Sequence, residues 1–82
     1  MTTPESIKSA IEAQLVCERV EVRGDGRHFE ALIVSPAFEA LSKVRRHQLV
    51  YGALGERMRE EVHALSMTTL TPAEWAERSR AR

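Results

Sequence analysis

The sequence is poor in cysteine and in long apolar stretches. Cys17 is the single cysteine among 82 residues, so no disulfide can form within the chain. No stretch approaches the roughly 20 apolar residues of a membrane-spanning helix. The amino end also lacks the basic and apolar segments of a secretory signal. These absences exclude a disulfide scaffold and predict a soluble, cytoplasmic protein with no membrane span.

A net charge is also absent. Twelve basic residues balance twelve acidic ones, so no overall field favours nucleic acid or a membrane surface. No serine, cysteine or histidine combination has the order of a known nucleophile motif, and no two carboxylates stand at obvious acid and base positions. We therefore expect that the protein is not an enzyme.

The length predicts a single domain over residues 1–82, with a frayed tail from about residue 79. A domain of this size has one modest core and no deep catalytic cavity, so we expect function on its surface. Aromatic side chains are few, and we expect all of them in the core or capping it: Phe29, Phe38, Tyr51 and Trp75.

The first half of the chain predicts a helix followed by a hairpin. A hydroxyl at the N-cap, a proline and an acid begin a helix over residues 3–15. Alternation of apolar and charged residues over 20–23 predicts a half-buried strand, which ends at the Gly-Asp-Gly turn of 24–26. Residues 28–34 form the returning strand.

The second half predicts three helices and a third strand. Ser35-Pro36 ends the hairpin, and residues 37–41 make one helical turn before Ser42, the N-cap of the longest helix, 43–58. A strand follows over 62–69, and Thr71-Pro72 begins the last helix. The predicted core face of the longest helix, from three- and four-residue spacing, consists of Val44, His47, Val50, Tyr51, Leu54 and Met58.

The element order is thus helix, strand, strand, short helix, long helix, strand, helix. A right-handed crossover through the long helix lays the third strand parallel to a strand of the hairpin. We therefore predict an α+β domain in which helices cover one face of a three-stranded mixed sheet.

Several segments, taken in order, resemble the BolA family, and residues 71–76 resemble its IbaG-type bacterial branch. The resemblance covers roughly residues 5 to 78. The segments are Gly24-Asp25-Gly26-Arg27-His28-Phe29, then Leu41-Ser42-Lys43-Val44-Arg45-Arg46-His47-Gln48 with Val50-Tyr51, then Val62-His63-Ala64-Leu65-Ser66, and finally Thr71-Pro72-Ala73-Glu74-Trp75-Ala76.

The resemblance implies a class II KH-like fold, of order α-β-β-α-α-β-α, and a partner. BolA-like proteins pair with monothiol glutaredoxins and share a [2Fe-2S] cluster supported by glutathione. One iron ligand of the family is the histidine that opens the third strand, here His63. The other is a cysteine or histidine of the loop between the first two strands, here His28.

The ligand chemistry is coherent for these two histidines. Neutral imidazoles can replace thiolates on one iron of a [2Fe-2S] centre. Two nitrogens cannot hold a cluster alone, so a partner must supply the other ligands, and we expect the isolated chain to be apo. A dimer of two copies stays open as the source of those ligands. From pattern alone, each histidine is a polar residue at a strand end.

Cys17 lies outside the hairpin loop that carries the family's cysteine ligand. We expect a small, largely buried hydrophobe at this position, and a spare ligand or oxidation site if it is exposed.

The densest basic cluster, at Lys43, Arg45 and Arg46, supports an alternative function. With the preceding turn it resembles a helix-turn-helix, and members of the family have been regarded as DNA-binding regulators of stress responses. The balanced charge, the few aromatics and the absence of a Gly-x-x-Gly loop at 39–42 place DNA second. Leu49, predicted to point away from the core beside Arg45 and Arg46, suits a protein contact. Our first prediction is an accessory protein of iron-sulfur trafficking or regulation.

Overall fold

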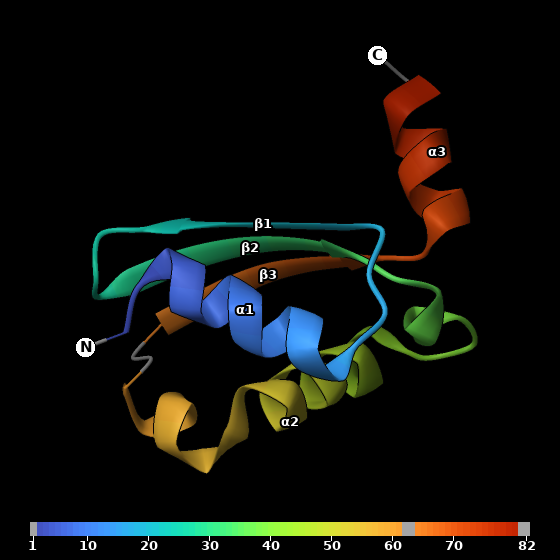
Figure 1. The fold of residues 1–82 in the computed structure, drawn as a ribbon. Coiled ribbons are helices and arrows are strands. Elements are labelled where there is room, and N and C mark those ends of the chain that lie inside the picture. Colours follow the sequence, from blue (N-terminus) through green and yellow to red (C-terminus); the bar gives the residue numbers. More distant parts are fainter. Residues whose placement is uncertain (1, 62–63, 81–82) are drawn as a thin grey trace.

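The computed structural model describes residues 2–61 and 64–80, with the backbone alone for 57–61. The elements follow the predicted order and confirm the α-β-β-α-α-β-α arrangement (Figure 1). They are α1 (Pro4–Gln14), β1 (Arg19–Gly24), β2 (His28–Val34), the 3-10 helix η1 (Pro36–Phe38), α2 (Lys43–Glu61), β3 (Ala64–Leu70) and α3 (Pro72–Arg80).

The predicted start of α1 is confirmed by a reciprocal cap. The backbone N–H of Ser6 donates to the Thr3 hydroxyl at 3.1 Å, and the backbone N–H of Thr3 donates to the Ser6 hydroxyl at 2.9 Å. Two groups that the first turn would leave without partners are thereby satisfied. The helix buries Ile7 and Ile11 completely, which fixes the face that it turns to the sheet.

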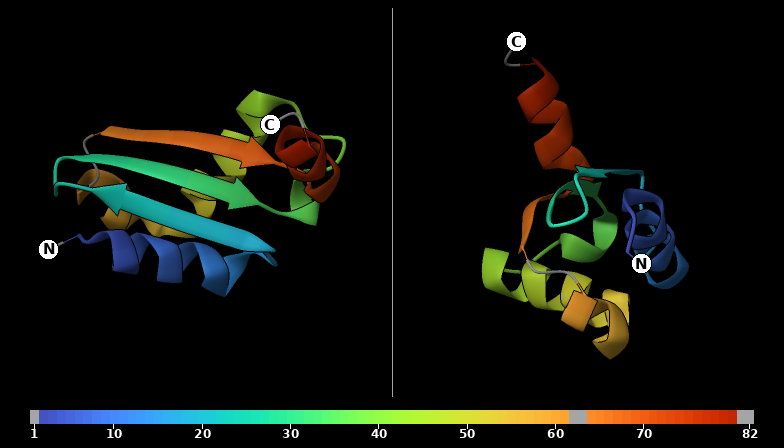
Figure 2. Two further views of the ribbon diagram at one scale, coloured as in Figure 1. Left: turned by 90° about the horizontal axis from the view of Figure 1, so that it is seen from above. Right: turned by 90° about the vertical axis from the view of Figure 1, so that its left-hand side faces the viewer.

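The sheet has the strand order β1-β2-β3 (Figure 2). β1 and β2 form an antiparallel hairpin in which Gly24 pairs with Phe29. β2 and β3 are parallel, and their register pairs His28 with Ala64 and Val34 with Leu70. The predicted three-stranded mixed sheet, the core of a class II KH-like fold, is confirmed.

The helices α1 and α2 lie together on one face of the sheet, as predicted (Figure 1). Alternate residues of β2, from Phe29 through Ala31 to Ile33, are buried in the core on this face. Phe38 of η1 is also fully buried there, and the half-buried Tyr51 packs against the core, which confirms three of the four aromatics predicted in the core or capping it; Trp75 is half-buried. The helix α3 continues from the end of β3 and points away from the layer of α1 and α2.

The helix α2 begins as predicted, with Ser42 as its N-cap. The backbone N–H of Arg45 donates to the Ser42 hydroxyl at 3.2 Å. The helix is longer than predicted, reaching Glu61, but it is kinked at Gly55, where φ is 80° and ψ is 162°. A residue with a Cβ rarely adopts this conformation, so the glycine permits the kink.

The predicted core face of α2 is partly wrong. Val50 and Leu54 are buried as expected, but Val44 is 66% exposed. The buried stripe instead begins at Arg46, and Leu49, expected to point outward, is half-buried and packs against the core. The reason is that Arg46 occupies the inner face of the first turn, where its guanidinium has polar partners.

Candidate functional site

The turn between β1 and β2 holds the first predicted ligand, His28. The Oδ1 atom of Asp25 accepts hydrogen bonds from the backbone N–H groups of Arg27 and His28, each at 2.9 Å. The backbone N–H of Asp25 donates to the carbonyl of His28 at 3.2 Å. Both polar backbone groups of His28 are therefore tied to Asp25.

Two further features define this turn. The N–H donors of His28 and then of Arg27 lower the pKa of Asp25, because they stabilise its carboxylate form. At Gly24, an added Cβ would lie 2.4 Å from the carbonyl oxygen of His28 and 2.6 Å from a ring carbon of Phe29. Any side chain at this position would displace the backbone of His28, so the close approach requires glycine.

The His28 side chain is exposed, and its ring makes no hydrogen bond or ion pair with any residue that the structure describes. Its register partner, Ala64, directly follows His63 in the sequence. The second predicted ligand, His63, lies outside the described residues. Among the side chains that the structure describes, in residues 2–56 and 64–80, no group of three or more His, Cys, Asp or Glu could hold a metal ion.

Cys17 lies at the opposite end of β1 from the His28 turn. It precedes Arg19, the first residue of this six-residue strand, whereas His28 follows its last residue, a separation of about 20 Å at 3.3 Å per residue. Cys17 is half-buried and packs against the core. Burial raises the pKa of its thiol, so the reactive thiolate is disfavoured. Cys17 is thus less buried than the largely buried hydrophobe that was predicted, but its contact with the core fits a small hydrophobe.

Only part of the predicted basic surface is exposed in the structure. Lys43 and Arg45 are exposed, but Arg46 is only 9% exposed. Its Nε atom donates to the carbonyl of Leu41 and its Nη1 atom to the carbonyl of Thr69, both at 3.0 Å. The interpretation of Arg46 as part of an exposed surface is therefore wrong, and with Leu49 half-buried only Lys43 and Arg45 of that set are exposed.

Arg46 also forms an ion pair that the sequence did not indicate. Its Nη1 and Nη2 atoms lie 2.7 Å and 3.3 Å from the two carboxylate oxygens of Glu74. The same carboxylate accepts the backbone N–H of Thr71 at 2.8 Å, and the Thr71 hydroxyl accepts the backbone N–H of Glu74 at 3.1 Å. Arg46 first, and then the Thr71 N–H, lower the pKa of Glu74 to about 2.

The Thr71-Pro72 segment predicted the start of α3 correctly, and Glu74, three residues after the Thr71 hydroxyl, completes a capping box. It could not have indicated Arg46, which lies 28 residues earlier in the chain. Such a distant ion pair has no signature in local spacing.

The architecture and turn define the class of the protein: a small class II KH-like α+β domain with a histidine presented at the end of its hairpin. The chain belongs to the BolA family, since the family model described as BolA-like protein matches residues 4–74. No helix within the described part of the chain is long and apolar enough to cross a membrane.

Individual relatives agree with this assignment. The chain is 41% identical over 71 residues to the acid stress protein IbaG of Escherichia coli, covering 85% of this chain and 84% of that protein. This similarity confirms the IbaG-type resemblance. A bolA protein homologue from Coxiella burnetii has a solved structure with a TM-score of 0.80 and 47% identity, covering 93% of this chain and 99% of that one.

A third relative is described as a DNA-binding transcriptional regulator, the BolA protein of Haemophilus influenzae. It is 43% identical over 53 residues, which cover 65% of this chain and 52% of that protein. Members of the family are thus described both as a stress protein and as a transcriptional regulator.

Proposed function

We propose that this chain is an accessory protein of cytoplasmic iron-sulfur trafficking or regulation. It binds a monothiol glutaredoxin and contributes His28 and His63 to one iron of a shared [2Fe-2S] cluster. The observation that carries the proposal is the placement of His28, whose backbone is tied by Asp25 and whose side chain is exposed at the start of β2. Membership of the BolA family supports it.

The donor set fits half of such a cluster. Neutral imidazoles are established ligands for one iron of a [2Fe-2S] centre, and the other iron requires thiolates. Since two imidazoles cannot hold a [2Fe-2S] cluster alone, the partner and its glutathione would supply the sulfur donors. The cluster would provide an iron-sulfur unit that passes between proteins, and this chain's residues would bind and orient one side of it.

The turn would lower the entropic cost of binding. Because Asp25 holds the backbone N–H of His28, the imidazole is presented from a fixed backbone rather than from a loose loop. The register supports the same assignment, since it pairs His28 with the residue that follows His63 in the sequence.

The test is to mix the purified chain with a cluster-loaded monothiol glutaredoxin under anaerobic conditions and to record visible absorption, circular dichroism and complex formation. His63→Ala and His28→Ala should each weaken or alter the cluster spectrum. His47→Ala provides a matched control, because His47 is half-buried in α2, away from the turn. Unchanged spectra and no complex with the wild-type chain would sink the proposal.

A second candidate, a DNA-binding regulator, is favoured by the similarity to the Haemophilus influenzae protein. Lys43 and Arg45, exposed at the start of α2, would contact phosphates. Binding should then fall steeply with salt, and a Lys43→Glu, Arg45→Glu double variant should lose it. A Lys8→Glu, Arg80→Glu variant changes the charge equally elsewhere. Gel shifts at two salt concentrations compare the variants, and equal binding by both would exclude this surface.

A further inference from the structure

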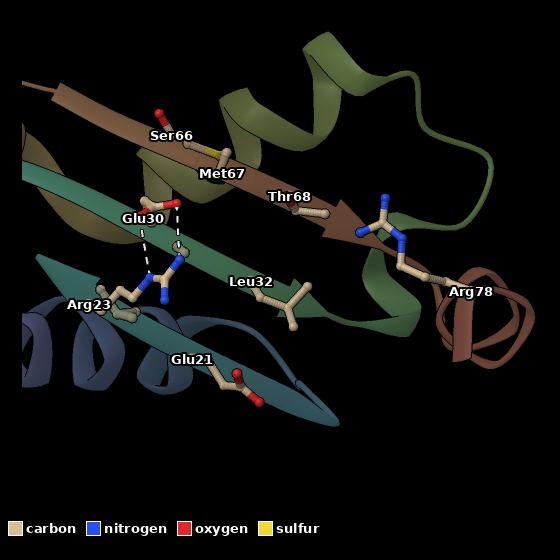
Figure 3. Close-up of a pocket in the computed structure, with 10 residues that line it drawn as sticks. Glu21, Arg23, Glu30, Leu32, Ser66, Met67, Thr68 and Arg78 are labelled. Carbon is tan, nitrogen blue, oxygen red and sulfur yellow. Dashed lines mark hydrogen bonds and ion pairs between the residues drawn. The ribbon is translucent and has the colours of Figure 1, made fainter. Parts of the chain in front are cut away.

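The sheet face opposite α1 and α2 carries a groove of about 550 Å³. Its floor and sides come from all three strands, because alternate side chains of each strand point to this face. Figure 3 shows Leu32 of β2 between Glu21 of β1 and Thr68 of β3, with Glu30 between Arg23 and Ser66 further along the strands. The helix α3 bounds one end through Arg78. The groove is thus separate from the predicted basic surface at the start of α2.

Two carboxylates and two guanidinium groups line this groove, but not all of them have an ion-pair partner. Arg23 and Glu30 form an ion pair, with 3.3 Å between Nε and Oε2, and Glu21 pairs with Arg19. Arg78, in contrast, makes no ion pair with any described side chain, in residues 2–56 or 64–80. Its guanidinium extends from α3 over the ends of the strands in Figure 3. Among the four charged side chains that line the groove, Arg78 is therefore the one with no ion-pair partner in the described part of the chain.

The remaining lining suits a polypeptide backbone. The hydroxyls of Ser66 and Thr68 can donate to carbonyls and accept from amides, and Leu32 provides an apolar part of the floor. A guanidinium binds a carboxylate through two parallel hydrogen bonds. We propose that this groove binds an extended segment of a partner protein, with one carboxylate of that segment paired to Arg78.

The lining argues against a nucleic acid as the occupant. The carboxylates of Glu21 and Glu30 line the same groove and would repel a chain of phosphates. A stacking platform is also lacking nearby, because the half-buried ring of Trp75 is already covered by the Arg19 guanidinium, 5.0 Å from the ring centroid. A single carboxylate matches the single unpaired arginine.

The experiment uses a soluble library of random peptides as long as the seven-residue β3, with free carboxyl termini. The library is passed over the immobilised full-length chain in the presence of a metal chelator. Binding then does not depend on any cluster, so the result is independent of the proposed iron-sulfur function. Enriched peptides are titrated into the isotopically labelled chain and followed by NMR.

The enriched peptides should bind through an acidic side chain or the terminal carboxylate and should shift the amide signals of Leu32, Ser66 and Thr68. Arg78→Glu should weaken them about tenfold or more, because a charge-assisted hydrogen bond is lost. Arg80→Glu is the matched control, since Arg80 is on the same helix but pairs with Glu77 and does not line the groove.

Thr68→Val, which removes one hydroxyl and keeps the shape, should weaken the peptides less than Arg78→Glu does. Both arginines are exposed, so thermal unfolding should be nearly unchanged in their variants. No enrichment, equal binding by Arg78→Glu and the wild type, or tighter binding of a short oligothymidylate at the same amides would each overturn the proposal.

Discussion

At the scale of single residues, the pair of Arg46 and Glu74 has the clearest energetic role. Arg46 is nearly buried, and its guanidinium reaches α3 through Glu74 and β3 through the carbonyl of Thr69. A buried guanidinium without a carboxylate partner is strongly unfavourable. The ion pair therefore makes the stability of the fold sensitive to the charge of Glu74.

The first prediction concerns acid. The pKa of Glu74 is about 2 in the folded chain, against 4.5 for an ordinary glutamate. A lowered pKa stabilises the fold above pH 4.5, and this contribution is lost as the pH falls towards 2. Denaturant unfolding between pH 5 and 2 should show a weaker pH dependence for Glu74→Gln than for the wild type.

Glu77→Gln is the control for this prediction, because Glu77 and Arg80 form an ion pair in which both side chains are exposed. Its unfolding curve should follow the wild type at every pH. If the unfolding of Glu74→Gln has the same pH dependence as that of the wild type, the ion pair between Arg46 and Glu74 does not contribute to stability.

The second prediction concerns the His28 turn. Asp25→Ala removes the acceptor of the Arg27 and His28 backbone N–H groups, so these amides should exchange with solvent several-fold faster. Asp25→Asn keeps an oxygen acceptor and should preserve most of the protection. Hydrogen exchange followed by NMR measures both variants, and unchanged exchange in Asp25→Ala would contradict the turn.

The sequence predicted the turn before His28 correctly because the signal is local: Gly-Asp-Gly favours a tight turn, and the strand begins two residues after it, at His28. It failed for Arg46 because burial of an arginine depends on a carboxylate brought near by the fold. The assignment of His63 as a ligand stays a prediction, as it rests on the family resemblance.

At the scale of elements, two glycines of α2 should respond oppositely to the same substitution. Gly55→Ala should destabilise the fold by about 1–3 kcal/mol, because φ of 80° with ψ of 162° is a conformation for glycine alone. Gly52→Ala should stabilise it by about 0.5–1 kcal/mol through helix propensity. Nothing lies within 4 Å of a Cβ at either position, so contacts do not confuse the comparison.

Denaturant unfolding of both variants measures the difference. Equal changes in the free energy of unfolding at the two positions would contradict the conclusion that the kink at Gly55 requires glycine. The sequence did not predict this kink, since Gly55 lies inside an otherwise regular helical spacing and only its backbone angles distinguish it from Gly52. The bounds of β2 were predicted correctly, because turn and proline signals flank it on both sides.

At the scale of the whole molecule, one small core carries the stability. Val50→Ala should cost about 2 kcal/mol, since Val50 is fully buried and loses two methyl groups from the core. Val44→Ala on the same helix should change stability by less than about 0.5 kcal/mol, because Val44 is 66% exposed. Urea unfolding compares the two variants. Similar losses of stability would contradict the exposed position of Val44.

The overall topology was predictable because few arrangements connect this order of elements. Alternation and turn signals place the hairpin, and the crossover through α2 makes β3 parallel to β2, as observed. The groove on the opposite sheet face was not predicted. The sequence of β3 does not show whether a helix covers the sheet face opposite α1 and α2. The direction of α3 depends on contacts with residues outside β3.

The carboxylate of Glu74 caps α3 and also neutralises Arg46 on α2. A helix of nine residues is too short to be stable alone in water. The first turn of α3 therefore gains its anchor only after α2 has docked and brought Arg46 into place. The C-terminal helix should consequently be among the last parts to become ordered during folding, and its order reports that the rest of the domain has assembled.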